Sequence, residues 1–203
     1  MRALTLASLS VRGFRNLGAL DLSFGPRFNV VSGDNGQGKT NLLEAIYVLA
    51  TSKSFRAGKP GEMVAHGADT ASVRGAIDDG GLRREQSVGL RHGGRVVHVD
   101  GQKPKTLAAY AVLTPAVVFH PAELSMSMGA GSERRKLLDR VCLYTRPSAM
   151  ASLDAYTRAL KSRQKILELR GSGARDLDAW EELLVRHALE VRDARTEGCS
   201  LLA

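Results

Sequence analysis

The feature that most constrains this chain is a phosphate-binding loop at residues 33–40, which reads Gly-Asp-Asn-Gly-Gln-Gly-Lys-Thr. It matches the pattern GxxxxGK[ST] in full. A short apolar run at residues 28–31 precedes the loop, and a segment of good helix formers at residues 41–50 follows it. Strand, glycine loop and helix in this order separate a nucleotide site from a chance glycine-rich turn. The sequence therefore predicts a site for a nucleoside triphosphate.

Each part of the loop has a chemical role in this prediction. The glycines let the backbone curl so that several N–H groups face a polyphosphate, and the first turn of the next helix adds unpaired N–H groups. Lys39 is expected to reach the β- and γ-phosphates, and the Thr40 hydroxyl to bind Mg²⁺. With ATP and Mg²⁺ as cofactors, the predicted binding residues are Gly33, Asp34, Asn35, Gly36, Gln37, Gly38, Lys39 and Thr40.

Charge and composition narrow the class of protein. The 203 residues carry a formal net charge of +8. Residues 121–170 alone hold ten Lys or Arg against five acids, a net +5. This balance favours a polyanionic partner, with nucleic acid the leading candidate. No apolar run approaches a membrane span, and two cysteines fit a reduced protein, so we expect no membrane association and a cytoplasmic location.

Apolar periodicity divides the chain into two parts. Alternating residues and short apolar runs predict β-strands up to residue 119, whereas from residue 122 onward the spacing is helical, with a break at residues 171–173. We expect a nucleotide-binding lobe over residues 1–120 that contains an antiparallel β portion, and a basic helical lobe over residues 121–203. The expected β segments are residues 4–11, 20–24, 28–31, 71–99 and 116–119.

Seven segments in order along the chain resemble the RecF family of bacterial DNA replication and repair proteins. This family belongs to the ABC-type ATPases, which also include the SMC proteins. Any one segment is a weak signal, but seven in the family's order are specific. They are residues 11–16 (with Phe-Arg-Asn), 33–45, 52–56 (with Ser-Phe-Arg), 118–124, 131–139 (with Glu-Arg-Arg), 156–164 and 178–183.

The resemblance implies a fold and a function. The fold is the α/β head of an ABC-type P-loop ATPase, with a mixed sheet, followed by a mostly helical second lobe. The function is ATP-dependent binding of gapped or junction DNA in recombinational repair, replication and the SOS response, with RecO, RecR and RecA as partners and an ATP-dependent homodimer. The residues it suggests for DNA or nucleotide contacts are Arg12, Arg15, Asn16, Arg134, Arg135, Arg158, Lys161 and Lys165.

The sequence departs from the family in two motifs. An ABC ATPase needs an apolar strand that ends in Asp-Glu, and a signature loop from the opposing subunit. Neither is found here, so the chain resembles an N-terminal part of the family, ended early, and no catalytic residue is assigned. Two alternatives stay open: a truncated non-catalytic nucleotide- or DNA-binding module, and a small-molecule kinase. Arg134 and Arg135 beside Asp139 fit a structural ion-pair cluster as well as they fit DNA contacts.

Overall fold

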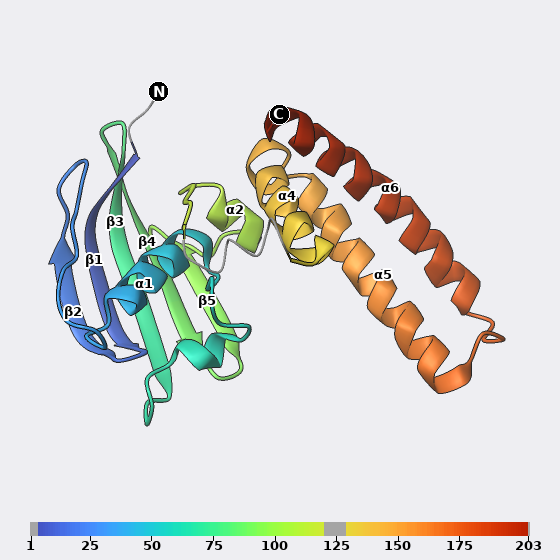
Figure 1. The fold of residues 1–203 in the computed structure, drawn as a ribbon, viewed down its shortest axis with the longest axis horizontal. Coiled ribbons are helices and arrows are strands. Elements are labelled where there is room, and N and C mark those ends of the chain that lie inside the picture. Colours follow the sequence, from blue (N-terminus) through green and yellow to red (C-terminus); the bar gives the residue numbers. More distant parts are fainter. Residues whose placement is uncertain (1–3, 120–128, 203) are drawn as a thin grey trace. The chain divides into compact units, whose positions relative to one another are not determined.

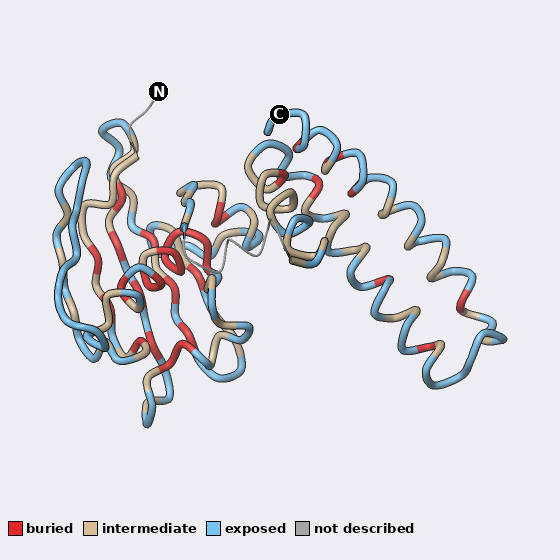
Figure 2. Tube along the Cα trace, in the orientation of Figure 1, coloured by how far each residue is buried: buried red, intermediate tan, exposed pale blue. Residues whose placement is uncertain are grey.

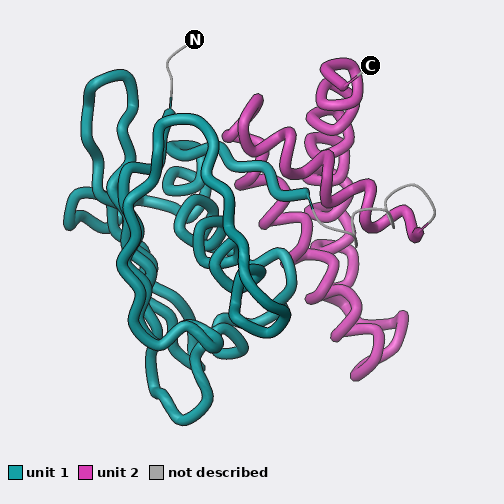
Figure 3. Tube along the Cα trace, turned by 60° about the vertical axis from the view of Figure 1, so that its left-hand side comes forward, with its two compact units in different colours: residues 1–119 teal, residues 120–203 magenta. Residues whose placement is uncertain are grey.

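The structure is a computed structural model that describes residues 4–119 and 129–202. The chain divides into two compact units, residues 1–119 and 120–203 (Figure 3). The described residues of the first form a β-sheet covered by a helix, and those of the second form helices α4, α5 and α6. Figure 1 shows both units. The expected lobe boundary at residues 120–121, and residues 120–124 of one RecF-like segment, lie outside the described residues.

The first unit is built on a five-stranded antiparallel sheet with the order β2-β1-β3-β4-β5. Side chains alternate between the two faces of a strand, so every second residue of β3 points into the core. The turn at Asp79-Gly80 joins β3 to β4, as the sequence predicts. The strands are β1 (Leu4–Phe14), β2 (Leu17–Ser23), β3 (Thr70–Asp79), β4 (Leu82–Arg91) and β5 (Gly94–Val99).

Helix α1 (Lys39–Thr51) packs its apolar side chains on one face of this sheet (Figure 2). Gly75 in β3 permits the close approach, because a Cβ there would lie 2.8 Å from the Ser8 carbonyl oxygen and would also meet the Leu49 side chain of α1. The short elements η1 (Pro60–Met63) and α2 (Leu107–Ala111) complete the core. Tyr110 of α2 is fully buried and donates its hydroxyl to the Leu49 carbonyl at 2.5 Å. The P-loop helix is therefore held on a rigid support.

Two of the predicted strands are wrong. Residues 28–31 and 116–119 are irregular, and no segment among residues 4–119 and 129–202 pairs with them. Phe28, Val30, Val117 and Phe119 are between 83% and 91% exposed. A strand is stabilised by hydrogen bonds to a neighbouring strand. Both runs have an apolar, β-type composition, but the described chain supplies no neighbour to pair with them.

In residues 129–202 the second unit contains α4 (Gly131–Thr145), α5 (Ala149–Arg170) and α6 (Leu177–Leu202). Helices α5 and α6 form an antiparallel hairpin whose connection contains the predicted break at residues 171–173 (Figure 1). Small and branched side chains lie in the seams between the helices, and the buried ones include Ala159, Ile166, Val191 and Ala194.

Candidate nucleotide-binding site

The loop at residues 33–40 turns directly into α1, with Gly38 as the N-cap residue. Gly36 and Gly38 have φ angles of 88° and 96°, in the region that favours glycine. A Cβ on Gly38 would also lie 2.7 Å from Oδ1 of Asn16. The path of the loop therefore depends on glycine at position 38.

The N-terminus of α1 has the properties of an anion site. No side chain caps it, since Gly38 has none, so its first N–H groups face the loop together with the positive end of the helix dipole. The Lys39 ammonium donates to the carbonyl oxygens of Gly33 and Asp34, each at 2.7 Å. Gln37 accepts a hydrogen bond from the Asp34 N–H at 3.1 Å and so braces the turn. Donors and positive charge thus gather on one short segment.

The remaining predicted loop residues are open to solvent. Asn35 lies exposed at the tip of the loop, and Thr40 lies exposed in the first turn of α1. A hydroxyl at that position has the chemistry of one Mg²⁺ ligand, and Mg²⁺ usually completes its shell with substrate phosphates, carboxylates and water. Within the two described segments, no three His, Cys, Asp or Glu side chains are grouped to hold a metal. The donors present fit a polyphosphate and one magnesium ligand.

A chain of hydrogen bonds braces the loop from behind. Asn16 Nδ2 donates to the Gly36 carbonyl at 2.9 Å, and Asn16 Oδ1 accepts from Asn41 Nδ2 at 2.6 Å. Asn41 Oδ1 in turn accepts from Arg56 Nη2. Because each amide uses both its donor and its acceptor, the position of Gly36 is coupled to that of Arg56.

The chain of hydrogen bonds ends on Glu44, a fully buried carboxylate in α1. Arg15 donates to it through Nε at 3.1 Å and Nη2 at 2.9 Å, Ser54 donates at 2.5 Å, and Arg56 completes the set. Burial alone would raise the pKa of Glu44, but hydrogen bonds from Arg15, Ser54 and Arg56 outweigh it and hold the pKa below its ordinary value. Glu44 thus ties α1 to the segments on either side.

The sequence analysis missed this network. Asn41, Glu44, Ser54 and Arg56 all lie in segments that resemble the RecF family, yet none of the four was selected as a site residue. One signal was available: Glu44 is a charged residue on the apolar face of a buried helix, and a buried carboxylate requires a cationic partner.

The structure gives different surroundings to the three candidates of residues 12–16. Asn16 contacts the loop, as described above. Arg15 instead binds Glu44 and donates to the Glu62 carbonyl at 2.6 Å. Arg12 projects from the sheet face opposite α1, where it pairs with Asp21 at 2.6 Å. Of the three, only Asn16 is positioned to affect a bound nucleotide directly.

The basic candidates of the helical unit also lie in different surroundings. Arg158, Lys161 and Lys165 are exposed along one stripe of α5. Among the described ion pairs, that of Asp139 is made with a residue other than the neighbouring Arg134 and Arg135. Asp139 pairs with Arg195 of α6, at 2.7 Å and 3.0 Å, a partner 56 positions away that sequence spacing does not reveal.

No helix in the described segments is long and apolar enough to cross a membrane.

Comparison with known proteins follows the same division of the chain. Residues 5–118 match the family described as RecF/RecN/SMC N terminal domain. The DNA replication and repair protein RecF of Anaeromyxobacter sp. (strain Fw109-5) is 43% identical over 162 residues, which are 80% of this chain and 44% of that protein. RecF of Geobacter sp. (strain M21) is 36% identical over 190 residues, which are 94% of this chain and 52% of that protein. The chain thus spans about half the length of the curated relatives it matches.

Solved structures show the same fold. "Structure of the recombination mediator protein RecF-ATP in RecFOR pathway" aligns with a TM-score of 0.89 at 28% identity, over 98% of this chain and 54% of that chain. The corresponding RecF-ATPrS structure gives 0.88. The predicted ABC-type P-loop ATPase head followed by helices is confirmed. Since the family match covers more than half of its length, the chain belongs to the RecF/RecN/SMC N-terminal domain family and corresponds to an N-terminal part of RecF.

Proposed function

We propose that this chain binds ATP with Mg²⁺ at residues 33–40 and serves in RecF-type DNA repair. The observation that carries the proposal is the uncapped N-terminus of α1, which adjoins a glycine loop and the Lys39 ammonium. Curated relatives are named DNA replication and repair protein RecF, and solved relatives are named RecF-ATP, which supports the same assignment.

The loop residues divide the work of holding the nucleotide. The N–H groups of the loop and of the first α1 turn bind phosphate oxygens, and Lys39 exchanges its two carbonyl partners for the β- and γ-phosphates. Thr40 supplies one oxygen to Mg²⁺, which neutralises phosphate charge when bound. Asn16 holds the Gly36 carbonyl in place and so keeps the neighbouring N–H groups aimed inward. No residue of the chain is assigned to hydrolysis.

DNA is the proposed macromolecular partner. The net charge is +8, and the exposed side chains of Arg158, Lys161 and Lys165 on α5 form a basic stripe suited to a phosphate backbone. We further propose gapped or junction DNA as the target, an ATP-dependent homodimer as the active form, and RecO, RecR and RecA as partners in the cytoplasm. The phrase "RecFOR pathway" in the names of both RecF structures supports the first two of these protein partners.

A second candidate function is a nucleotide- or DNA-binding module without turnover. It is favoured by the lack, in this sequence, of an apolar strand that ends in Asp-Glu. ATP turnover by the 203-residue chain, with and without duplex DNA, distinguishes the two. Turnover that disappears in Lys39→Ala would exclude the non-catalytic module, whereas a folded chain that binds ATP without turnover would favour it.

Lys39→Ala tests the nucleotide site itself. The variant loses charge-assisted hydrogen bonds to phosphate worth about 1.5–3 kcal/mol, which is roughly 10- to 100-fold in Kd. Calorimetric titration with Mg-ATP measures the loss, and circular dichroism checks that the fold is unchanged. Lys105→Ala, an exposed lysine of the same unit, is the matched control and should bind ATP as the wild type does. Equal ATP affinity in Lys39→Ala and Lys105→Ala would refute the site.

A further inference from the structure

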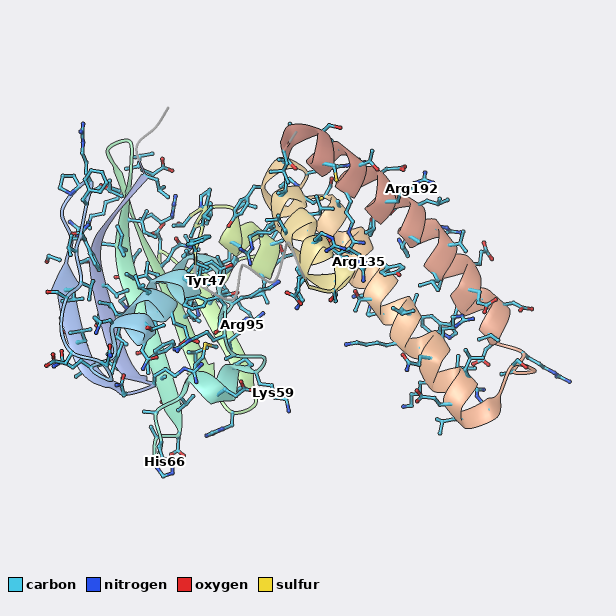
Figure 4. All side chains as sticks on the ribbon, viewed as in Figure 1. Tyr47, Lys59, His66, Arg95, Arg135 and Arg192 are labelled. Carbon is cyan, nitrogen blue, oxygen red and sulfur yellow. The ribbon has the colours of Figure 1, made fainter. Side chains whose placement is uncertain are left out.

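The helical unit contains a cavity of about 290 Å³ where α4, α5 and α6 meet. Its lining includes Arg195 of α6 together with Arg135 of α4 and Arg192 of α6, the latter two labelled in Figure 4. None of the described residues that line it is acidic. The larger cavity on the open face of the sheet differs in this respect. There, Arg74, Arg83 and Arg84 are accompanied by Asp21, Glu85 and Asp100. The helical cavity is thus the more strongly basic of the two.

The three guanidinium groups differ in how far they are already used. Asp139 fixes Arg195 through Nε and one terminal nitrogen, which leaves N–H donors of this five-donor group free. Arg192 pairs with its neighbour Asp193, but both side chains are more than half exposed, so the pair is weak. Arg135 is exposed and makes no hydrogen bond or ion pair with any residue of the described segments. The lining therefore holds unused donors and positive charge.

The apolar side chains that line the cavity further define the class of ligand that it fits. Val191 is buried, and Tyr156 of α5 lines the cavity beside it. Apolar side chains in the lining limit competition from water, and planar guanidinium forks match the oxygens of a phosphate group. A phosphate attached to a sugar would use both parts of the lining.

We propose that this cavity binds a phosphate group, supplied by the backbone of nucleic acid. The source of the phosphate rests on the DNA function proposed above, whereas the phosphate chemistry does not. Arg192 and Arg195, which the sequence did not indicate, thereby become candidate phosphate contacts. Arg135 belongs to this cavity and not to the basic stripe on α5. Arg195 is positioned by Asp139, while Arg135 and Arg192 line the cavity from α4 and α6.

Cys199 offers a direct measure of occupancy, because it lines the cavity and is exposed while Cys142 is buried. The rate of Cys199 alkylation by neutral iodoacetamide is measured with duplex DNA, with inorganic phosphate and without either. The test variant is Arg135→Gln/Arg192→Gln, and Arg175→Gln/Arg186→Gln, exposed away from the cavity, is the control with the same loss of charge. In parallel, DNA affinity is measured against salt concentration with Mg-ATP present.

We expect DNA to slow alkylation in the wild type and the control, but not in the test variant. The slope of log K against log salt should fall in magnitude by about 0.9 in the test variant, because one phosphate is no longer neutralised. If DNA binds but neither protects Cys199 nor responds to the test variant, the cavity assignment is wrong and the DNA function stands. If DNA does not bind while inorganic phosphate protects Cys199, the DNA function fails and the phosphate site stands with a free anion as its source. Protection by neither refutes the proposal.

Discussion

Glu44→Gln tests whether the buried carboxylate network carries the stability of the nucleotide-binding unit. Glutamine keeps the size of the side chain but removes the charge shared by Arg15 and Arg56. Removal of one partner from a buried ion pair costs about 3–5 kcal/mol. Because the two arginine side chains keep 25% and 37% of their exposure, water takes over part of the lost interaction. We therefore expect the low end, about 3 kcal/mol of unfolding free energy.

Urea unfolding followed by circular dichroism at pH 7 measures this loss. In a thermal melt, a change of about 3 kcal/mol corresponds to roughly 6–12 °C for a chain of this length. Glu133→Gln is the control, since its pair with Lys136 is exposed on α4 and contributes less than about 0.5 kcal/mol. A loss below about 1 kcal/mol in Glu44→Gln would refute the reasoning, because that is the size of an ordinary substitution.

The dependence of stability on pH tests the same role of Glu44 in a second way. The folded pKa of Glu44 lies below its ordinary value of 4.5, so its contribution to stability is complete above that value and is lost as the pH falls through the folded pKa. The stabilities of wild type and Glu44→Gln should therefore converge as the pH is lowered below about 4.5. A constant difference across that range would show that the charge of Glu44 is not what stabilises the fold.

Two further substitutions test one contact in each of the two units. Asn16→Ala removes the hydrogen bond to the Gly36 carbonyl and should weaken ATP binding by about 0.5–1.5 kcal/mol, roughly 2- to 12-fold in a titration with a fluorescent ATP analogue. Unchanged affinity would remove Asn16 from the site. Arg195→Met leaves the half-buried Asp139 without its partner and should cost about 1–3 kcal/mol, followed by the fluorescence of Trp180, the one tryptophan of the sequence. An unfolding midpoint equal to that of the wild type would contradict the role given to this pair.

The sequence predicts features that depend on residues within a short window. It does not predict which distant segments lie next to each other. The loop, the helix after it and the turn at Asp79-Gly80 follow from residue types within a short window, and the structure confirms them. The runs at 28–31 and 116–119 have the apolar, β-type composition of strands, but a strand also requires a neighbour, and composition says nothing about one. Most of their apolar side chains are exposed, so the residue types of these runs predicted neither the pairing nor the environment.

The same limit applies to the site. The glycines and Lys39 lie within eight consecutive residues, so the motif alone locates them. The contacts of Glu44 with Arg15, and of Asp139 with Arg195, join residues 29 and 56 positions apart. Only the fold brings such residues together. A buried charge in the sequence signals that a partner exists, without identifying it.

The exposed runs at residues 28–31 and 116–119 bear on every measurement of self-association. Apolar extended segments outside a sheet are templates for pairing with a second chain. Association through them rises with protein concentration and is indifferent to nucleotide. The proposed homodimer, in contrast, responds to ATP and requires Lys39. Sedimentation over a dilution series, with and without Mg-ATP, therefore resolves two equilibria that a single molecular-mass measurement would merge into one.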